Sequence, residues 1–568
     1  MSMDDFVEDL IAVLEENDSL SKEDIAKRKV ELCRKHAMKK IPTDIEVFLH
    51  APDDVSSWLR TRLQTKPNRS LSGVAPIAIM TSPHSCPHGK CTMCPGGVDG
   101  EWGDTPQSYT GAEPAAMRGA RAGFDPYFQV FNRLEQYAVT GHILSKVDLI
   151  IMGGTFPARD KSYQDEFVMY AFKAMNDFSD RFFDDAGEFL LEEFKRFFEL
   201  PGDIYDADRE TRIRSRLEEL KCSSSLETEQ VRNESSFIRC IGLTIETRPD
   251  WGLEEHGDLM LEQGCTRVEL GIQSVYDDAL SAIDRGHDIA CNKQSIAVLR
   301  DLGFKLNFHM MLGLPGVDEK REKQGLAQLF EDSSYQPDML KLYPCMVMPG
   351  TKLLHDFEAG RYTPFSTERA AAVIGWFLSK VPAYCRVMRV QRDIPTYRRA
   401  AGVDRTNLRQ YVDRFMDEHD LKSRDIRARE VGRKSAGPHP ANASLEVIEY
   451  EASAGKEFFI SFEDTDADAL YGFCRLRFPS RQLRAEFTPS TAIIRELHVY
   501  GSAARLGAAD GSSFQHKGFG RKLLARAERI ALEHGYDKML VISGVGVRGY
   551  YRKFGYDREG PYMAKKLA

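Results

Sequence analysis

The segment APIAIMTSPHSCPHGKCTMCPGG, residues 75–97, joins a short apolar run to a loop that contains three cysteines. Cys86, Cys91 and Cys94 have the spacing C-x4-C-x2-C, which can wrap around a small metal centre. One candidate is an iron–sulfur cluster with three protein thiolates and one iron open to a substrate. The other candidate is a structural zinc ion, which needs a fourth ligand from the protein.

Two histidines, His84 and His88, flank the cysteines and could complete a Cys3His zinc set. The position of the loop favours the cluster instead. The loop follows the first strand of a strand–helix series, and barrels built from such series carry their active sites on the loops after the strands. The sequence therefore predicts an iron–sulfur cluster at Cys86, Cys91 and Cys94.

Short apolar runs alternate with amphipathic stretches through the first two thirds of the chain. Such runs indicate strands buried on both faces, and the alternation indicates an α/β fold with a parallel sheet, open or closed into a partial (β/α)6 barrel. An acidic, phenylalanine-rich stretch at about 176–232 interrupts the alternation and is interpreted as an insertion. The expected strands are residues 75–80, 146–154, 238–247, 266–273, 305–312 and 339–347.

The C-terminal part of the chain has a different pattern, with adjacent strands separated by turns and then one amphipathic helix and a further strand. The residues before it are charged, and KSAGPHPANAS near their end is typical of a linker. The predicted organisation is a basic helical segment at 1–70, a barrel domain at 71–399, a basic linker at 400–443 and a second α/β domain at 444–568.

The composition is that of an ordinary globular protein, with 42% hydrophobic and 29% charged residues among 568. The N-terminus is acidic where a signal peptide would be basic, and no apolar run approaches the ~18 residues that a membrane-spanning helix needs. Eleven cysteines without regular spacing indicate free thiols rather than a disulfide framework. We therefore expect a cytoplasmic protein.

The formal net charge of −9 is unevenly distributed. Residues 24–40 hold seven basic and two acidic residues, residues 60–69 hold four basic and no acidic residues, and residues 386–434 hold fourteen basic and eight acidic residues. Residues 177–210 hold twelve acidic and four basic residues. Any single basic block could be a solvated helix face, but three blocks on an acidic protein favour a binding track for a polyanion.

The ends of later strands provide candidate ligands for a small molecule beside the cysteines. Gly153 and Gly154 in GGTF follow the second strand, where flexible backbone can approach amino and carboxylate groups. Glu246 in ETRPD and Gln273 in GIQS lie at the ends of the third and fourth strands. We expect these residues at the same face of the barrel as the cysteine loop.

Together these motifs resemble those of radical S-adenosylmethionine (SAM) enzymes, and more closely those of the catalytic subunit of Elongator. The resemblance rests on the cysteine loop and on YTGAEPAAMR, KVDLIIMGGTF, GLTIETRPD, VELGIQSVYDD and HMMLGLPG, and it covers nearly the whole chain. It implies that the three cysteines bind three irons of a [4Fe–4S] cluster while SAM chelates the fourth. The reduced cluster would then split SAM into methionine and a 5′-deoxyadenosyl radical. The family usually carries cysteines where this linker has Ser423 and Ala428, so the resemblance does not extend to a metal site there.

QHKGFGRKLL, residues 515–524, is a Q-x-x-G-x-G turn between a strand and a helix. Its glycines allow backbone N–H groups to converge on a pyrophosphate at the helix N-terminus, although a glycine-rich helix cap would have the same sequence. The preceding strand could pair its backbone with the pantetheine arm of a CoA thioester. With RGYYRKFGY, residues 548–556, these features resemble the Gcn5-related acetyltransferase fold.

This second resemblance places Tyr551 near the CoA sulfur, where a neutral phenol can protonate a departing thiolate. Tyr551 and Tyr550 are the candidate catalytic residues, although a core tyrosine is an equal interpretation of Tyr550. Lys146 matches a family position linked to acetyl-CoA, whereas the sequence alone would place it on the surface. The implied acetyl-CoA contacts are Glu496, Leu497, His498, Val499, Gln515, Gly518, Phe519, Gly520, Arg521 and Tyr551.

The resemblance implies an acyltransferase that modifies the wobble uridine of tRNA. The radical would take hydrogen from the acetyl methyl group, the resulting carbon radical would add to C5 of uracil, and thioester hydrolysis would leave 5-carboxymethyluridine. The basic blocks would hold the anticodon stem-loop through its phosphates, with the wobble base splayed into the barrel mouth. Elongator-like accessory subunits or a second copy of the chain are further candidate partners.

Two other functions fit parts of the chain. The leading alternative is a protein lysine acetyltransferase with a structural iron–sulfur domain, which predicts acetyl transfer to an amine and no cleavage of SAM. The other is a tRNA-binding scaffold that forms no product. The intact cysteine loop and the intact CoA turn in one chain argue against both.

Overall fold

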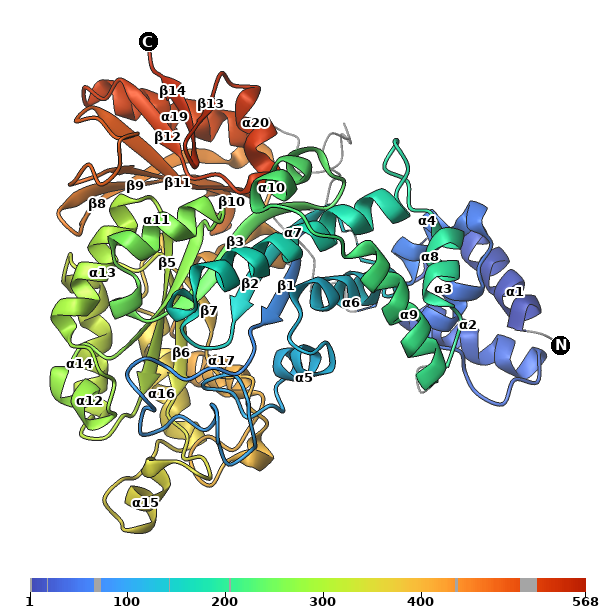
Figure 1. Ribbon diagram of the computed structural model, residues 1–568, viewed down its shortest axis with the longest axis horizontal. Helices are drawn as coiled ribbons and strands as arrows, with labels where there is room; N and C mark the ends of the chain where they lie inside the picture. Colours follow the sequence, from blue (N-terminus) through green and yellow to red (C-terminus); the bar gives the residue numbers. More distant parts are fainter. Residues whose placement is uncertain are drawn as a thin grey trace.

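The computed structural model describes residues 3–17, 19–65, 73–142, 144–203, 206–434, 438–500 and 518–568. Two seven-stranded sheets form the bulk of the molecule, and a group of helices from the N-terminus lies to one side (Figure 1). No helix in these ranges is long and apolar enough to cross a membrane.

The first sheet is entirely parallel, and its strands lie side by side in sequence order. β1 and β7 form its two edges, so the barrel is open, as predicted. Six strands confirm the predicted runs to within three residues. The seventh strand, β7, was not predicted, because a run of four residues is too short to show a strand pattern. The strands are β1 (Ala75–Met80), β2 (Lys146–Met152), β3 (Arg239–Thr247), β4 (Arg267–Gln273), β5 (Lys305–Leu312), β6 (Met339–Pro344) and β7 (Arg386–Arg389).

Alternate side chains of these strands face two different environments. Ile77, Leu149 and Phe308 belong to the apolar core that forms under the surrounding helices. The side chains between them point into the half-barrel, and many are charged or polar. The helices of this domain are α5 (Pro114–Arg121), α6 (Pro126–Val139), α7 (Lys161–Phe182), α11 (Glu254–Glu262), α12 (Asp277–Ala282), α13 (Ile289–Asp301), α14 (Glu319–Glu331), α15 (Lys352–Glu358) and α16 (Thr367–Leu378).

The N-terminal segment is helical, as predicted, and it has its own small core. Ser21 and Thr43 are the N-cap residues of two of its helices, and each forms a capping box. The cap side chain accepts the backbone N–H of an acidic residue three positions on, and the side chain of that acidic residue accepts the backbone N–H of the cap. Phe6, Leu10 and Leu59 are fully buried between the helices. The helices are α1 (Met3–Glu16), α2 (Lys22–Lys35), α3 (Asp44–His50) and α4 (Asp53–Arg62).

The acidic insertion connects the other parts of the molecule. Its helices are α8 (Leu191–Phe198), α9 (Ala207–Leu220) and α10 (Leu226–Ser235). On one side, Lys195 donates to the carbonyl oxygen of Ala51 in the N-terminal segment, at 3.2 Å. On the other side, Glu234 pairs with Arg548 at 3.1 Å and Arg552 at 2.6 Å in the C-terminal domain. The insertion therefore has a structural role as a bridge.

The second sheet is mixed and has the order β13-β14-β12-β11-β10-β9-β8. β11 pairs with β12 in parallel from Thr491 to Ile494 only, although β11 continues to Val499. The two strands therefore separate over the last part of β11. The elements are β8 (Ser444–Ala452), β9 (Gly455–Asp464), β10 (Ala469–Phe478), β11 (Thr491–Val499), α19 (Phe519–Glu533), β12 (Lys538–Val541), α20 (Arg548–Arg552), β13 (Asp557–Glu559) and β14 (Tyr562–Lys566).

Buried ion pairs join the two sheets. Arg495 of β11 donates to both oxygens of Asp338, which precedes β6, at 2.6 and 2.8 Å. Arg477 of β10 pairs with Asp301 at the end of α13, at 2.5 Å. These four side chains are 0–1% exposed. The C-terminal domain thus packs against the end of the barrel where β5 and β6 begin, and Figure 1 shows the loop after β1 at the opposite end.

Candidate functional site

Hydrogen-bond donors surround the three predicted cluster ligands. Gln107 Nε2 donates to the Cys94 sulfur at 3.0 Å, and Arg285 Nη1 donates to the Cys91 sulfur at 3.7 Å. The ring of His88 lies 3.2 Å from the Cys91 sulfur, with Nε2 as the contacting atom. Such donors stabilise the negative charge of a metal-bound thiolate and tune a bound cluster.

The spacing of the sulfurs fits a cluster better than a single zinc ion. Thiolates on one tetrahedral zinc ion lie about 3.8 Å apart, because each Zn–S bond is about 2.3 Å. Among the described residues, the only group of three ligand atoms within 4.8 Å of one another is that of Glu246, Glu269 and His309. Cys86, Cys91 and Cys94, with or without a histidine, do not form such a group, so their sulfurs are not arranged as ligands of one zinc ion.

The predicted SAM-binding residues lie beside the cysteine loop. Gly153 and Gly154 have φ values of +123° and +106°, and a Cβ atom on Gly153 would lie 2.3 Å from Thr81 Oγ1. Two buried polar atoms here have no partner among the described residues, the Oε1 of Gln273 and the Nε of Arg285. Buried polar groups are normally satisfied, so these atoms fit a site that a polar ligand completes.

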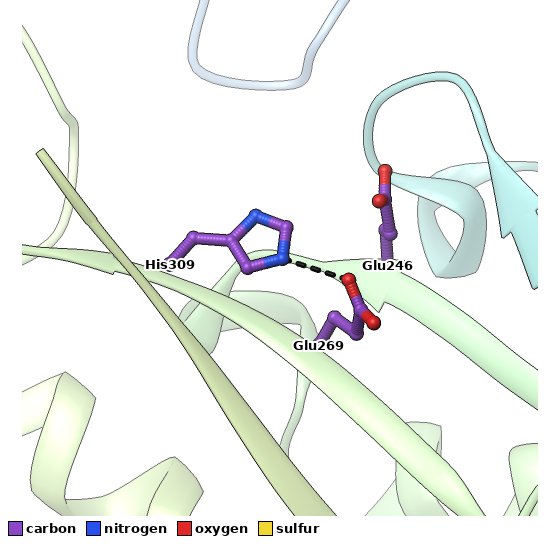
Figure 2. A group of neighbouring side chains, drawn as sticks. All are labelled: Glu246, Glu269 and His309. Atoms are coloured by element: carbon purple, nitrogen blue, oxygen red, sulfur yellow. Dashed lines mark hydrogen bonds and ion pairs between the residues drawn. The ribbon is translucent and has the colours of Figure 1, made fainter. Parts of the chain in front are cut away.

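The inside of the half-barrel contains a column of polar side chains, which we call the barrel column. At its end near the cysteine loop, Tyr109 Oη donates to Glu246 Oε2 at 3.3 Å. Lys341 Nζ lies 3.7 Å from Glu246 Oε1 and also donates to Glu269. His309 Nε2 contacts Glu269 at 2.8 Å, and Figure 2 shows this pair beside Glu246. The column therefore begins at Glu246, which is one of the predicted SAM-binding residues.

The end of the barrel column away from the cysteine loop reaches the C-terminal domain. Arg267 Nη2 donates to Asp148 at 2.9 Å, and Arg267 Nε lies 3.8 Å from Glu269. Lys305 is the neighbour of Arg267 in register on β5, and it pairs with Glu496 of β11 at 3.3 Å. Charged side chains thus extend from the cysteine face of the barrel to the strand that is implied to bind acetyl-CoA.

Electrostatics explain why the Glu246, Glu269 and His309 group is an ion-pair cluster. Burial alone would raise the pKa of the Glu269 carboxyl, but Lys341 and His309 hold it well below its usual range. Glu269 in turn keeps the pKa of Lys341 above its usual range, against the effect of burial. The ammonium group of Lys341 supplies the positive charge between the two carboxylates that a divalent cation would otherwise supply.

The described part of the predicted CoA turn begins at Gly518, at the N-terminus of α19. Gly518 caps the helix with φ +77°, a left-handed conformation that glycine adopts without strain. A Cβ atom on Gly520 would lie 2.7 Å from Tyr550 Oη, so this tyrosine packs directly on the turn. Phe519 is buried and Arg521 is exposed. The remaining predicted turn residue, Gln515, lies outside the described residues.

The separated part of β11 and the tyrosine of α20 face the same region of the C-terminal domain. Burial lowers the pKa of His498 to about 4, so its ring is neutral at pH 7. Burial also raises the pKa of Tyr551, and Cys474, Tyr550 and Glu496 add to the shift. Tyr551 is therefore a neutral phenol that can donate a proton.

One predicted acetyl-CoA contact, Glu496, has a side chain with another role. Burial would raise the pKa of Glu496, but Lys305 and Arg475 lower it to about 2, so its carboxylate is part of the domain interface. Leu497 and Val499 are half-buried on the same strand, with their backbone beyond the last pair to β12. Any ligand contact of β11 therefore involves mainly its backbone.

Lys146 is placed differently from the expectation based on sequence alone. It starts β2, is half-buried, and burial lowers its pKa. Its register partner is Arg239 on β3, and a Cβ atom on Gly546 of the C-terminal domain would lie 2.5 Å from Arg239 Cβ. Lys146 therefore lies close to the junction of the two domains rather than on an open surface.

The linker positions without cysteines have a hydrogen-bonded structure of their own. Ser423 Oγ donates to Asp425 Oδ1 at 2.9 Å, and Asp425 accepts the backbone N–H of Ala428 at 3.2 Å. Asp425 thus caps the short helix α18 (Ile426–Arg429). This arrangement offers no thiolate ligand.

Family models match most of the chain. They are the ELP3 N-terminal domain at residues 3–71, the Radical SAM superfamily at 80–324, the Radical_SAM C-terminal domain at 337–418 and the Acetyltransferase (GNAT) family at 427–556. With the site geometry, these matches define the class: a radical SAM enzyme, which uses a [4Fe–4S] cluster and SAM, joined to a GNAT domain, which uses acetyl-CoA.

Similar proteins identify the family. The chain is 41% identical to a tRNA uridine(34) acetyltransferase of Methanocaldococcus jannaschii, over 97% of this chain and 95% of the relative. It is 38% identical to Elongator complex protein 3 of Saccharomyces cerevisiae, over 94% and 90%. A solved structure of archaeal Methanocaldococcus infernus Elp3, with an N-terminal deletion (1–46), has a TM-score of 0.71 at 37% identity and covers 88% of this chain and 100% of that chain. The chain belongs to the family of tRNA uridine(34) acetyltransferases and Elongator complex protein 3.

Proposed function

We propose that the protein transfers the acetyl carbon unit of acetyl-CoA to C5 of the wobble uridine of tRNA, by radical SAM chemistry. The observation that carries the proposal is that buried ion pairs join the domain with the cysteine loop to the domain with the predicted CoA turn. A three-thiol loop with sulfur-directed donors lies at one end of the barrel. The predicted CoA turn, of which Gly518 is described at the N-terminus of α19, belongs to a domain that buried ion pairs join to the other end.

We propose cofactor ligands among the residues beside the cysteine loop. Cys86, Cys91 and Cys94 would hold the cluster, and Gly153 with Gln273 would contact SAM. A cluster with bound SAM supplies a carbon-centred radical that can take hydrogen from a strong C–H bond such as that of an acetyl methyl group. No side-chain base in the barrel can remove that hydrogen as a proton with comparable ease.

The protein's own side chains handle the protons. Addition of a carbon radical at C5 of uracil leaves a ring radical, which must lose one electron, for which the oxidised cluster would be the acceptor, and the C5 proton. His309 contacts Glu269 through Nε2, and no described residue hydrogen-bonds its Nδ1. The His309–Glu269 pair is therefore suited to accept this proton, while the neutral phenol of Tyr551 is suited to protonate the CoA thiolate when the thioester is cleaved.

The proposal favours tRNA over a protein amine as the substrate. A lysine acetyltransferase would need only the C-terminal domain, and it would leave the donors around the three thiols without a purpose. We propose that the basic N-terminal segment and the linker hold the anticodon stem-loop, because phosphate contacts by lysine and arginine dominate RNA affinity. A cytoplasmic location belongs to the same proposal and is supported by eleven cysteines without a disulfide. The need for accessory subunits or a second copy stays a prediction.

The test is nucleoside analysis of tRNA after anaerobic incubation with acetyl-CoA, SAM and a reductant. The wild-type protein should produce 5-carboxymethyluridine, and Cys91→Ala should produce none and should not cleave SAM. A matched control is Cys222→Ala, which alters an exposed thiol outside the site and should retain full activity. A Cys91→Ala protein that still forms the product would contradict the proposal.

A further inference from the structure

One aromatic side chain stands out on the surface near the mouth of the barrel. Tyr397 is 78% exposed, and among the phenylalanine, tryptophan and tyrosine residues that the structure describes it is the only exposed one. It makes no ring–ring contact and no side-chain hydrogen bond with the described residues. The apolar ring therefore contributes little to folding and is accessible to a ligand.

Three arginines next to Tyr397 in the sequence have no carboxylate in direct contact among the described residues, although Arg399 lies near enough to Asp404 to help lower the pKa of that carboxyl. Arg392, Arg398 and Arg399 have no ion pair within 4.0 Å in the described ranges. The acids nearest in sequence are engaged elsewhere, since Asp393 pairs with Arg389 and Asp404 lies 3.8 Å from Arg405. Arginines without a direct ion pair around an exposed ring form a cationic surface with a flat apolar face.

This surface, which we call the Tyr397 patch, is tied to the cysteine loop. Arg392 Nη2 donates to the carbonyl oxygen of Ser108 at 2.5 Å, and the hydroxyl of Ser108 lies 3.5 Å from the Cys94 sulfur. Arg398 Nη1 donates to the carbonyl oxygen of Thr110 at 3.1 Å, and its guanidinium group lies 4.2 Å from the centre of the Trp102 ring. The patch is thus held at the edge of the cluster site.

An exposed aromatic ring among arginines has the chemistry that recognises single-stranded nucleic acid. Proteins bind unpaired bases by stacking them on aromatic rings, and they bind the flanking phosphates with arginine. A protein partner would need apolar contacts beyond one ring, and the patch offers mainly charge. The observations therefore favour an RNA loop as the occupant.

We propose that Tyr397 stacks on an unpaired base of the tRNA anticodon loop next to the reacting uridine, and that Arg392, Arg398 and Arg399 bind the adjacent phosphates. This proposal rests on the proposed function, because it needs tRNA as the substrate. The physical reason is that a base that leaves its stack to enter the barrel exposes a face of its neighbour. The Tyr397 ring would cover that face and so favour the extruded state.

Binding to anticodon stem-loop hairpins tests the role of Tyr397 without any need for catalysis. With the full-length protein carrying its cluster, Tyr397→Ala should weaken binding by about 5- to 100-fold, as expected for the loss of one base–aromatic stack, without changing the salt dependence. Tyr397→Phe keeps the ring and should bind like the wild type. Arg399→Gln should instead lower the salt slope by about one unit. Leu532→Ala, which removes an exposed apolar side chain on α19, should bind like the wild type.

Hairpins with an abasic nucleotide at one loop position at a time identify the stacked base. At one position beside the wobble uridine, wild type and Tyr397→Ala should bind equally, because the base that the ring covers is gone. A Tyr397→Ala protein that binds every intact hairpin like the wild type would overturn the proposal and favour a protein ligand. Equal losses for Tyr397→Ala and Leu532→Ala would also overturn it.

The fate of the proposed function is measured separately. If Tyr397→Ala weakens hairpin binding but neither the wild type nor the variant forms a modified nucleoside, the proposed function fails, whereas the RNA-binding role of the Tyr397 patch stands. If product forms and Tyr397→Ala forms it at the wild-type rate with limiting tRNA, the patch fails and the proposed function stands.

Discussion

Replacement of Arg495 by methionine tests whether buried ion pairs hold the two domains together. The guanidinium group donates to Asp338 at 2.6 and 2.8 Å, to Glu457 at 3.0 Å and to the carbonyl oxygen of Phe304 at 2.7 Å. Arg495→Met leaves two buried carboxylates without their shared cation. Breaking a buried pair in this way costs about 3–5 kcal/mol.

The lower end of that range is expected, because other arginines remain near both carboxylates. Arg475 lies 3.4 Å from Asp338, and Arg477 lies 3.0 Å from Glu457. A loss of about 3 kcal/mol should make the amides of β11 exchange with solvent roughly 100-fold faster, because each 1.4 kcal/mol is a factor of ten when exchange follows local opening. Hydrogen exchange of the native protein, read by mass spectrometry, measures this directly.

A surface pair provides the matched control for this measurement. Arg526 and Glu533 lie 3.3 Å apart on exposed faces of α19, and Arg526→Met should cost no more than about 1 kcal/mol. Adding Asp338→Asn to Arg495→Met should recover part of the loss, because it removes a carboxylate left without its cation. The β11 amides of the Arg526→Met control should exchange within about fivefold of the wild-type rate. If those of Arg495→Met did so too, the buried ion pairs would not be what joins the domains.

The other predictions concern catalysis and pH. Gly518→Glu should block acetyl-CoA binding, measured by calorimetry, and Tyr551→Phe should bind acetyl-CoA but form product about 100-fold more slowly. His309→Gln should slow product formation by about 100-fold or more while SAM cleavage continues. The pKa of Glu496 is lowered from 4.5 to about 2, so the ionised carboxylate stabilises the folded protein fully above pH 4.5, and this stabilisation is lost as the pH falls toward 2. In Glu496→Gln, the free energy of unfolding measured in urea should depend less on pH between 4.5 and 2.

Much of the fold follows from patterns that the sequence shows locally. Six apolar runs were long enough to be recognised as strands, and the β7 run RVMR was not, because four residues give no period to read. The cysteine loop after β1 was predicted from its spacing and place. Gly153, Gly154, Glu246 and Gln273 lie at the same face, since parallel strands bring their carboxyl ends together.

Apart from Glu246, the residues of the barrel column were not predicted, although the sequence carries a signal for them. Glu269, His309 and Lys341 each lie between two apolar neighbours in their strands. That alternation marks a polar inner face, but only the register between strands shows that the three side chains meet. The depth of Lys146 and the bridging role of the acidic insertion depend on contacts between distant segments, which no local pattern encodes.

The most direct measurement for the central claim uses acetyl-CoA with a fully deuterated methyl group, together with tRNA, SAM and a reductant. The account predicts that 5′-deoxyadenosine gains one deuterium and that the wobble uridine gains a carboxymethyl group with the two remaining deuterium atoms. Modified uridine together with 5′-deoxyadenosine that contains no deuterium would contradict the account, because the acetyl methyl group would then not be the site from which the radical takes hydrogen.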